Sequence, residues 1–537
     1  MGRLLVEGLA PGGRLGTAVL AGILSAPMTW RAAWHTVEAA AGGTIVAAAL
    51  GGAMALLVTL TDLRGRNALV FCFVLPLLVP PQVTALAWLQ LFGPSSPVLN
   101  LLGMAPPVGT RNPLYSRDGI ILLLGVHYAP LVFLALRAGA RHLPRDLVEA
   151  GHAAGAGGLK VLTTIIVPLM TPALLAGVTL TFVSCVGNFG IPALLGIPGN
   201  YTVLTTLIYQ RLAGLGTSVL AEVSALSVLV GLLALGGLVV QHWVYRRGDY
   251  RVAGVSRGPL PYPLGRWRVV VEGACWAVIL TVLVLPLTAL VLTSLLPAYG
   301  VTLSAATATL ANYDYVILGH GATRRAFTNS FFLAAGAALV IVALSTPLGY
   351  FLVWRRLAAL RVLDLAVELP YALPGVVLAI ACILVFLKPL PLIGVSVYNT
   401  VWIIFIAYVM RFLTLGLRPV ISGFHQLDRA LDEAAQMSGA ALIFRLRTIV
   451  LPLVAPAAAA GAIFVFLTAF NELTVSALLW SSGAETLGVV VFGLEQGGES
   501  TQAAAVAVLT VAVTVVLMIA ASVAARRLPI GVIPWRG

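Results

Sequence analysis

Two short stretches of this chain carry the same polar and small residues at the same spacing. In each, a glutamate is followed by alanine, a glycine comes six residues after the glutamate, and a proline comes thirteen residues after the glycine. No loop supplies the paired carboxylates, nucleophile elbow or metal-spaced ligands that catalysis requires, so we assign no catalytic residue. We interpret both stretches as docking elements. The residues that define them are Glu149, Ala150, Gly155 and Pro168 in the first copy and Glu433, Ala434, Ala435, Gly439 and Pro452 in the second.

The residue types in each stretch predict a short helix. The alanine-rich residues that follow Asp146 and Asp432 favour a helix with an acidic first turn. The glycine can adopt the left-handed conformation that ends a helix, and the proline suits the first turn of the next membrane helix. Gly151 replaces an alanine in the first copy and should lower its helix propensity by roughly 1 kcal/mol. One copy could be a connector with an accidental pattern, but two copies in register favour a docking element.

The composition places these stretches between membrane-spanning helices. Of the 537 residues, 60% are hydrophobic and 9% are charged, and the mean hydropathy is +1.01, so most of the surface must face lipid. The four cysteines all lie in apolar stretches and predict neither disulfides nor a zinc site. A spanning helix needs about 20 apolar residues. The segments that meet or nearly meet this length are 37–61, 67–93, 118–139, 168–188, 219–243, 268–296, 329–355, 362–387, 398–419, 453–477 and 503–526.

The net charge of +13 indicates topology rather than nucleic-acid binding, because the basic residues lie between the apolar segments. One side of the membrane holds 23 of the 32 Lys and Arg residues and therefore should be the cytoplasm. Both docking stretches and the C-terminus lie on that side. The segments counted on it are 62–66, 137–160, 245–268, 355–361, 411–447 and the C-terminal tail.

An internal duplication relates the two halves. His35-Thr36 precedes Asn329-Ser330 by an offset of 294 in the numbering, and the offset falls to 284 after a longer loop at 92–117 in the first half. One insertion explains this change, and the matched loops require both halves to have the same orientation. The segment before the first half is a degenerate helix, the outside start of a five-span unit, or a start truncated upstream. The predicted organisation is an N-terminal segment 1–36, transmembrane domain 37–244 with docking loop 146–168, linker 245–267, transmembrane domain 268–526 with docking loop 430–452, and tail 527–537.

The doubled pattern resembles the EAA signature of permease subunits of bacterial binding-protein-dependent ABC importers. Over nearly its whole length the chain is similar to the fused, two-domain permeases for ferric iron, within the group that also serves thiamine and polyamines. The most similar stretches are 470–480 and 485–489, and their counterpart 187–192 is common to the whole group. The resemblance implies an all-α polytopic membrane protein with two tandem parallel repeats of the type I importer transmembrane domain and about 11–12 spanning helices.

The resemblance also implies partners. The chain lacks the Gly-x-x-x-x-Gly-Lys-Ser/Thr loop that binds nucleotide phosphates, so it should have no enzymatic activity and no cofactor, and a partner chain should bind ATP and Mg²⁺. In such permeases each loop of this kind, called a coupling loop, docks on one ATPase subunit. The two loops 146–168 and 430–452 therefore imply two copies of an ABC ATPase subunit. A periplasmic or extracellular binding protein should deliver the substrate, and membrane lipids should surround the chain. The expected location is the bacterial inner membrane, with many spans and a cytoplasmic C-terminus.

Three polar residues are candidates for the substrate path or gate. Glu472 lies near the outer end of an apolar segment, where burying a charge is costly, and Asn471 and the repeat-equivalent Asn188 could line the path with it. Ferric iron prefers carboxylate oxygen, so Glu472 could bind it transiently. Alternatively, Glu472 caps a helix or bonds across a domain interface. Thiamine or polyamine remain alternative substrates, and a secondary transporter of the major-facilitator type, which also has parallel repeats, is an alternative class.

Overall fold

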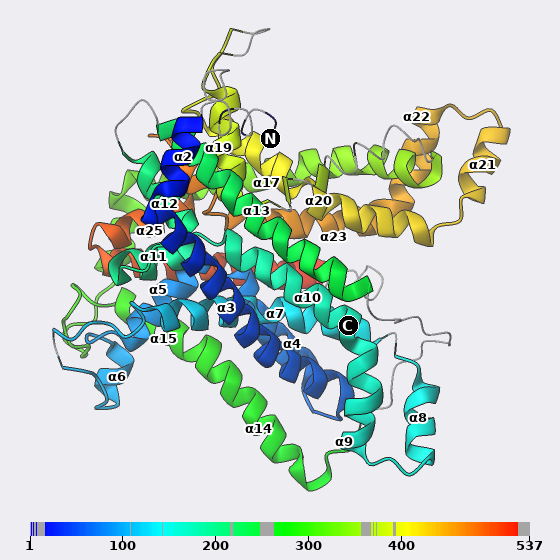
Figure 1. The fold of residues 1–537 in the computed structure, drawn as a ribbon, viewed down its shortest axis with the longest axis horizontal. Coiled ribbons are helices and arrows are strands. Elements are labelled where there is room, and N and C mark those ends of the chain that lie inside the picture. Colours follow the sequence, from blue (N-terminus) through cyan, green and yellow to red (C-terminus); the bar gives the residue numbers. More distant parts are fainter. Residues whose placement is uncertain are drawn as a thin grey trace. The chain divides into compact units, whose positions relative to one another are not determined.

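The computed structural model describes residues 17–107, 109–141, 143–214, 219–246, 262–355, 373–389 and 394–524, with a few isolated positions outside these ranges. Within them the named elements are helices (Figure 1), and the β-type pairing is an isolated bridge between Thr61 and Tyr262. This is the architecture expected where lipid cannot satisfy backbone groups, because a helix pairs its own N–H and C=O groups. The expected all-α, polytopic fold is therefore confirmed.

The chain forms two compact units, which we describe separately. The first-repeat unit contains residues 21–213 and 228–307, and the second-repeat unit contains residues 1–20, 214–227 and 308–537. The compact units therefore place 268–307 with the first repeat, whereas the sequence repeat assigns this segment to the second. The physical reason is packing, because Ala289 lies in one apolar cluster with Leu91 and Val98.

Three long helices form the core of the first-repeat unit: α3 (Pro27–Leu60), α7 (Arg117–Ala140) and α10 (Val167–Gly187). Figure 1 shows them side by side. Glycines allow this close approach, since a Cβ atom on Gly51 would lie 2.2 Å from the carbonyl oxygen of Ala129 and one on Gly125 would lie 2.4 Å from Val46. Small residues at crossings let membrane helices gain van der Waals contact without a hydrophobic driving force.

The same arrangement recurs in the second-repeat unit with α17 (Gly321–Gly349), α20 (Val401–Gln426) and α23 (Leu451–Phe470). A Cβ atom on Gly461 would lie 2.9 Å from the carbonyl oxygen of Gly416, and one on Gly416 would meet Ile341 at 2.3 Å. The α20–α23 crossing uses Gly461, and the α7–α10 crossing uses Gly177, its equivalent in the first repeat. The two repeats inferred from the sequence therefore also pack their three long helices in the same way.

Broken helices accompany each three-helix core. Helix α4 (Arg66–Leu78) is followed by α5 (Pro81–Phe92), and the segment from Pro81 to Leu101 is bent by 102° from α4. Helices α11 (Gly190–Gly199) and α12 (Leu204–Leu212) meet at 80°. In the second-repeat unit the corresponding short helices are α19 (Gly375–Phe386), α24 (Ser476–Leu479) and α25 (Leu487–Gln496).

Nine helices in the described part of the chain are long and apolar enough to cross a membrane, or up to eleven if each bent pair is one span. The sequence predicts eleven, but the two sets differ. The bent pair α11–α12 was not predicted as a span, and of the predicted span at 362–387 the structure describes α19, which has 12 residues. The predicted start at 37 was also late, because α3 begins at Pro27.

Three spanning helices contain a π turn directly before a Leu-Pro or Val-Pro pair: η2 (Leu162–Ile166), η4 (Leu280–Val284) and η7 (Leu446–Val450). Proline supplies no N–H group and its ring displaces the preceding carbonyls, so a wider turn accommodates it without ending the helix.

The remaining α-helices complete the two units. They are α2 (Thr17–Ser25), α6 (Pro97–Leu101), α8 (Arg145–Ala153), α9 (Gly158–Val161), α13 (Val219–Arg246), α14 (Arg268–Ile279), α15 (Leu285–Ser294), α16 (Ala311–Asp314), α21 (Ala430–Met437), α22 (Leu442–Arg445) and α26 (Ser500–Ala524).

Candidate coupling and translocation sites

The first coupling loop contains the predicted short helix, α8. The Arg145 Nε atom lies 2.6 Å from a carboxylate oxygen of Glu149, one helical turn away. Gly155 has φ of +81°, and the N–H group of Ala156 donates to the carbonyl oxygen of Gly151 at 3.1 Å. A left-handed glycine with this six-to-one hydrogen bond is the Schellman ending of a helix, as the sequence predicts.

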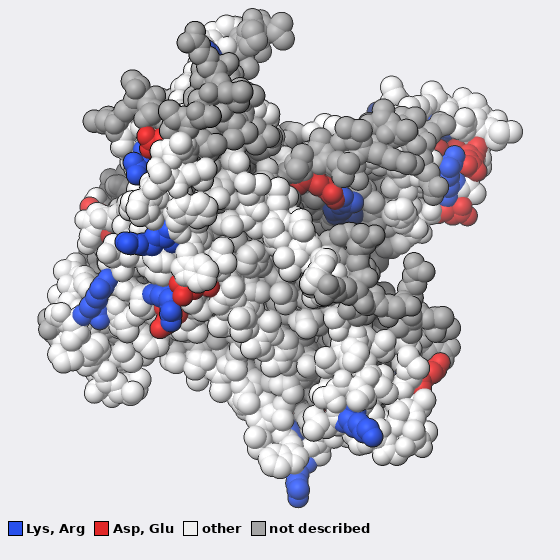
Figure 2. Space-filling model, in the orientation of Figure 1, with Lys and Arg blue, Asp and Glu red and all other residues white. Residues whose placement is uncertain are grey.

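The second coupling loop repeats this geometry at the equivalent position of its own repeat, in α21. Arg429 and Glu433 form the matching ion pair at 2.9 Å, Gly439 has φ of +79°, and Ala440 donates to the carbonyl oxygen of Ala435 at 3.1 Å. Figure 1 shows α21 and α22 at the end of the second three-helix core, and Figure 2 shows charges of both signs there. Equal geometry at equivalent positions makes the two loops one structural device used twice.

The predicted coupling residues lie on the surface of these loops. Of the nine, Ala435 is partly buried, and the others are exposed. Leu159 and its counterpart Ile443 are also exposed, at 76% and 79%, which gives each loop an apolar side chain for a partner. The two prolines are the second residues of α10 and α23, as predicted, but each spanning helix already begins at Gly158 or Leu442 and continues through a π turn. Each loop helix is therefore followed by an unbroken spanning helix.

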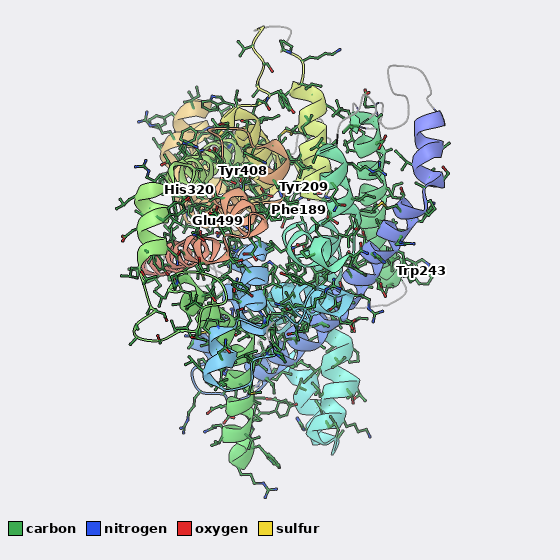
Figure 3. All side chains as sticks on the ribbon, turned by 90° about the vertical axis from the view of Figure 1, so that its left-hand side faces the viewer. Phe189, Tyr209, Trp243, His320, Tyr408 and Glu499 are labelled. Atoms are coloured by element: carbon green, nitrogen blue, oxygen red, sulfur yellow. The ribbon has the colours of Figure 1, made fainter. Side chains whose placement is uncertain are left out.

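Glu472 lies after the end of α23 and is 7% exposed. Its carboxylate oxygens accept hydrogen bonds from the N–H groups of Val475 at 2.9 Å and Ser476 at 3.2 Å, and from the Ser476 hydroxyl at 3.3 Å. Tyr408, labelled in Figure 3, shares a hydrogen bond of 2.7 Å with that hydroxyl. These are the contacts of a side chain that caps a helix, so the structure supports the interpretation of Glu472 as a cap. The interpretation of Glu472 as part of the substrate path stays a prediction.

Asn188 lies at the position of the first repeat that is equivalent to Glu472. Its Oδ1 atom accepts the N–H group of Ile191 at 3.0 Å, and its amide donates to Tyr128 at 2.9 Å. Asn188 and Glu472 thus cap the helix that follows in the same way. Next to Asn188, the Phe189 ring packs against Tyr209 with ring centroids 5.1 Å apart (Figure 3), which holds α11 to α12.

Asn471 points elsewhere. Its amide donates to the carbonyl oxygen of Leu467 at 3.0 Å and contacts the Thr514 hydroxyl of α26 at 3.4 Å. Within the described residues no three His, Cys, Asp or Glu side chains come together to hold a metal ion, so a transient metal contact of Glu472 stays a prediction. The structure brings Glu472 together with Tyr408 and Ser476 rather than with Asn471.

A model of the family described as binding-protein-dependent transport system inner membrane component matches residues 47–252 and again residues 345–529. The chain belongs to this family. Each match contains one coupling loop, which confirms the duplication, and the membership decides against the major-facilitator alternative. Proteins of this family are multi-pass inner membrane permease subunits of ABC transporters and are not themselves enzymes.

Relatives of this family cover much of the chain. A probable ABC transporter permease of Sinorhizobium fredii is 29% identical over 94% of this chain and 88% of its own length. The ferric transport system permease protein FbpB of Actinobacillus pleuropneumoniae is 28% identical over 83% of this chain and 64% of its own length. A putative ferric transport system permease protein of Haemophilus influenzae is 28% identical over 77% of this chain and 64% of its own length.

Sequence reasoning missed a buried polar cluster in the second coupling loop. The Asp432 carboxylate accepts a hydrogen bond of 3.0 Å from the Tyr350 hydroxyl and lies 3.4 Å from Arg445 Nε. The latter contact is an ion pair without hydrogen-bond alignment, since Arg445 Nε makes no hydrogen bond to any described residue. The equivalent residues of the first repeat are Val148 and Val161, both buried. Aligning the two repeats in the sequence shows charged residues at 432 and 445 where the first repeat has valines, and this difference could have revealed the buried polar cluster.

A second missed feature ties the end of the interdomain linker to the first coupling loop. Tyr262 pairs with the backbone of Thr61, and its hydroxyl lies 2.9 Å from His152 Nε2 on α8. Asp62 accepts the N–H group of Leu264 at 2.9 Å and forms an ion pair with Arg268. The N–H group of Leu264 and the Arg268 guanidinium hold the pKa of Asp62 below its usual value.

The structure also explains the His35-Thr36 and Asn329-Ser330 pairs. The Thr36 hydroxyl accepts the N–H group of Leu204, the first residue of α12, at 2.9 Å, and the Ser330 hydroxyl accepts that of Leu487, the first residue of α25, at 3.0 Å. His35 Nδ1 lies 3.0 Å from the carbonyl oxygen of Thr202, and Asn329 donates to that of Glu485 at 2.9 Å. Each pair clamps the short helix of its own repeat to a long one.

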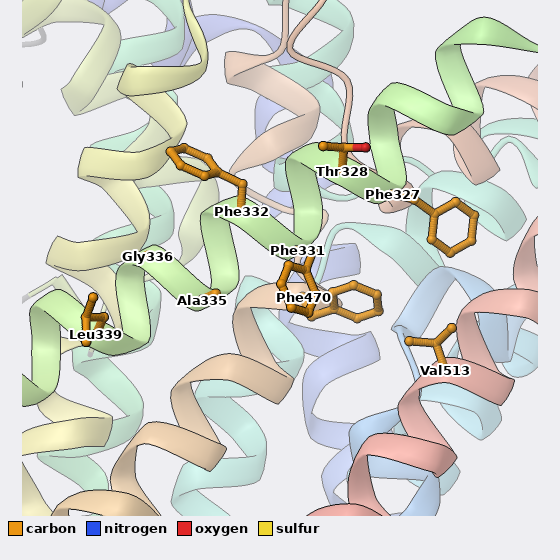
Figure 4. Close-up of a pocket in the computed structure, with 9 residues that line it drawn as sticks. All are labelled: Phe327, Thr328, Phe331, Phe332, Ala335, Gly336, Leu339, Phe470 and Val513. Carbon is orange, nitrogen blue, oxygen red and sulfur yellow. The ribbon is translucent and has the colours of Figure 1, made fainter.

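A pocket of about 650 Å³ lies along α17 in the second-repeat unit (Figure 4). None of the described residues that line it has a titratable side chain, so these residues offer no ligand to a charged cargo. The mainly apolar side chains that line the pocket suit the hydrocarbon chains of membrane lipids. The residues that line it are Phe327, Thr328, Phe331, Phe332, Ala335, Gly336, Leu339, Phe470 and Val513.

Proposed function

We propose that this chain is the permease of an ATP-driven importer that moves ferric iron, delivered by a binding protein, across the inner membrane. The observation that carries the proposal is the pair of coupling loops, which have the same ion pair and the same left-handed glycine at equivalent positions of the two repeats. Two coupling loops with the same geometry suit a partner that is itself present in two copies.

The loops are suited to transmit force from an ATPase. Each has a short capped helix with exposed polar and apolar residues, and the spanning helix that follows continues without a break through the π turn. A partner that moves α8 or α21 would therefore move α10 or α23 as a rigid rod. One copy of this chain would bind two ATPase subunits through Glu149–Pro168 and Glu433–Pro452, and ATP and Mg²⁺ would be bound by those subunits.

The excess of basic residues supports a cytoplasmic position for both loops and for the C-terminus. The substrate assignment is supported by relatives named as ferric transport permeases, which match 83% and 77% of this chain. Glu472, with Asn471 and Asn188, is our candidate for the path or gate, and its carboxylate is the hard ligand that ferric iron prefers.

Two measurements test the proposal. The chain, expressed with candidate ATPase and binding-protein subunits from the same genome, should co-purify with two ATPase subunits, and deletion of residues 430–441 should remove one of them. Cells that express the complete transporter should accumulate ⁵⁵Fe supplied as a ferric salt in preference to thiamine or spermidine. Preference for either organic cation would overturn the ferric assignment, and a chain that binds no ATPase would overturn the coupling.

A further inference from the structure

Equivalent positions in the two repeats carry basic side chains inside apolar helices. His127 is the eleventh residue of α7, and Arg411, its equivalent in the second repeat, is the eleventh residue of α20. Both lie near the middle of helices long enough to cross a membrane, so Arg411 lies in a span and not in the cytoplasmic segment 411–447 with which the sequence analysis counts it. Basic residues at such positions are rare because lipid cannot solvate them, and they mark substrate pathways or internal partners.

The guanidinium of Arg411 lies against the start of α19. A Cβ atom on Gly375 would lie 1.9 Å from Arg411 Nη1 and 3.1 Å from Thr474 Cγ2, so these three groups share one small space. The same guanidinium contacts the Phe412 ring, 5.9 Å from its centroid, and interacts electrostatically with Tyr408. Only glycine at position 375 leaves room for the cation there.

One nitrogen of the Arg411 guanidinium is available to donate a hydrogen bond. Its Nη1 atom is buried and has no hydrogen-bond partner among the described residues. Glu472 does not provide one, because no hydrogen bond joins its carboxylate to Arg411 Nη1 in the described part of the chain, and its oxygens instead accept the hydrogen bonds of Val475 and Ser476. A cation with a buried, unused N–H group is costly unless an anionic ligand completes it.

The first repeat has buried polar side chains at the matching place. His127 is 2% exposed, and its Nδ1 atom lies 3.4 Å from the Thr84 hydroxyl. Gln82, 1% exposed, has neither of its amide atoms hydrogen-bonded among the described residues. A Cβ atom on Gly190 would lie 3.3 Å from the Gln82 Oε1 atom, so this amide lies at the start of α11. Both repeats thus have unsatisfied buried polar groups beside a broken helix.

We propose that Arg411 is a recognition site for an anionic oxygen group, so that the cargo crosses as an anion or as an anionic ferric chelate rather than as a free ferric ion. This inference rests on the proposed function and specifies its substrate class. A trivalent cation at a given distance is repelled by a guanidinium three times as strongly as a monovalent one. A carboxylate or oxyanion ligand reverses the sign of this interaction and satisfies Nη1.

The test uses the complete transporter with its ATPase and binding protein in proteoliposomes, loaded with ⁵⁵Fe as ferric citrate or with ⁹⁹Mo-molybdate. At cargo levels below saturation, Arg411→Gln should lower uptake at least tenfold, whereas Arg411→Lys should lower it by less. Gly375→Ala should also lower uptake, because it displaces the guanidinium and keeps the charge. Arg324→Gln, which removes an exposed arginine from α17, is the matched control and should change uptake less than twofold.

Competition separates recognition from a structural role. Unlabelled citrate should inhibit uptake by the wild-type permease more strongly than uptake by Arg411→Lys. Uptake by Arg411→Gln equal to or above the wild type would overturn the proposal, as would equal inhibition of both proteins. If Arg411→Gln does not assemble, Gly375→Ala and Arg411→Lys decide. Arg411-dependent uptake of molybdate without iron would support the anion site and refute the ferric assignment, whereas iron uptake independent of Arg411 would do the reverse.

Discussion

The Asp432 carboxylate and the Arg445 guanidinium lie 3.4 Å apart inside the second coupling loop, with 6% and 3% of their side chains exposed. The Tyr350 hydroxyl donates to the same carboxylate and so ties α21 to the end of α17. In the first repeat, Val148 and Val161 occupy the equivalent positions. One loop is therefore held by a buried ion pair and the other by apolar contact.

Breaking this ion pair on one side should destabilise the second loop. Asp432→Val leaves Arg445 buried without a counter-charge, and such losses cost about 3–5 kcal/mol. The double substitution Asp432→Val with Arg445→Val copies the first repeat and should recover most of that loss, because it removes both charges. Differential scanning fluorimetry of the purified complex and ATPase co-purification measure the effect. Equal stability of the single and double variants would contradict this account of the pair.

The left-handed glycines should matter more than their neighbours. No atom of the described residues lies within 4 Å of a Cβ built on Gly155, Gly439 or Gly157, but of these three glycines only Gly155 and Gly439 have positive φ. Gly439→Ala and Gly155→Ala should therefore cost about 1–2 kcal/mol each from backbone strain and weaken ATPase binding, measured by titration of labelled ATPase. Gly157→Ala is the matched control and should bind normally. A Gly157→Ala defect as large as that of Gly155→Ala would argue for side-chain bulk instead.

The linker contact should stabilise the first coupling loop. Tyr262→Phe removes the hydrogen bond to His152 and keeps the ring contact, at a cost of about 1 kcal/mol. Hydrogen–deuterium exchange of residues 145–157 should become faster, while that of residues 429–441 stays unchanged. Trp267→Phe, an exposed change in the same segment, is the control. Unchanged exchange in Tyr262→Phe would show that the contact does not hold α8.

Glu472 tests the proposed path. Glu472→Gln keeps an oxygen that can accept the N–H group of Val475 but removes the carboxylate, so the cap should persist while a carboxylate ligand for the iron centre is lost. We expect lower ⁵⁵Fe uptake with intact assembly and basal ATPase activity. Glu499→Gln, at an exposed loop position, should leave uptake unchanged. Normal uptake by Glu472→Gln would remove Glu472 from the path.

The Arg325–Glu485 ion pair should make the α25 clamp sensitive to acid. Burial raises the pKa of Glu485, but hydrogen bonds from Arg325 and from backbone N–H groups outweigh this, so its pKa lies below the usual value. A lowered pKa contributes stability that is present above the ordinary value of 4.5 and is lost as pH falls through the lowered one. The protection of residues 483–490 against hydrogen exchange, corrected for intrinsic rates, should therefore decrease when the pH is lowered below about 4.5.

Glu485→Gln provides the control for this pH dependence. It cannot carry the charge that Arg325 pairs with, so its exchange protection should be lower near neutral pH and should change little on acidification. If both proteins lose protection in parallel as the pH falls, a group other than Glu485 controls the clamp.

Much of the fold followed from local patterns. Apolar runs of about 20 residues predict spans wherever the helix is straight, as at 118–139, which the structure extends to α7 at Arg117–Ala140. The pattern failed where a helix breaks, because α11 and α12 are each too short to cross a membrane and meet at 80°. It also placed the starts of two spans too late, at 168 and 453, since a π turn lets the helices that begin at Gly158 and Leu442 continue through proline.

The sequence by itself determined the membrane class, the duplication and the shape of both coupling loops. These features depend on composition and on residues within a few positions of one another, such as the glutamate and the left-handed glycine of each loop. Only the tertiary structure showed that Asp432 pairs with Arg445, that Tyr262 reaches His152, and that Arg411 lies against Gly375. The physical reason is that these contacts join residues 13, 110 and 36 positions apart, and only the packing of helices brings their side chains together.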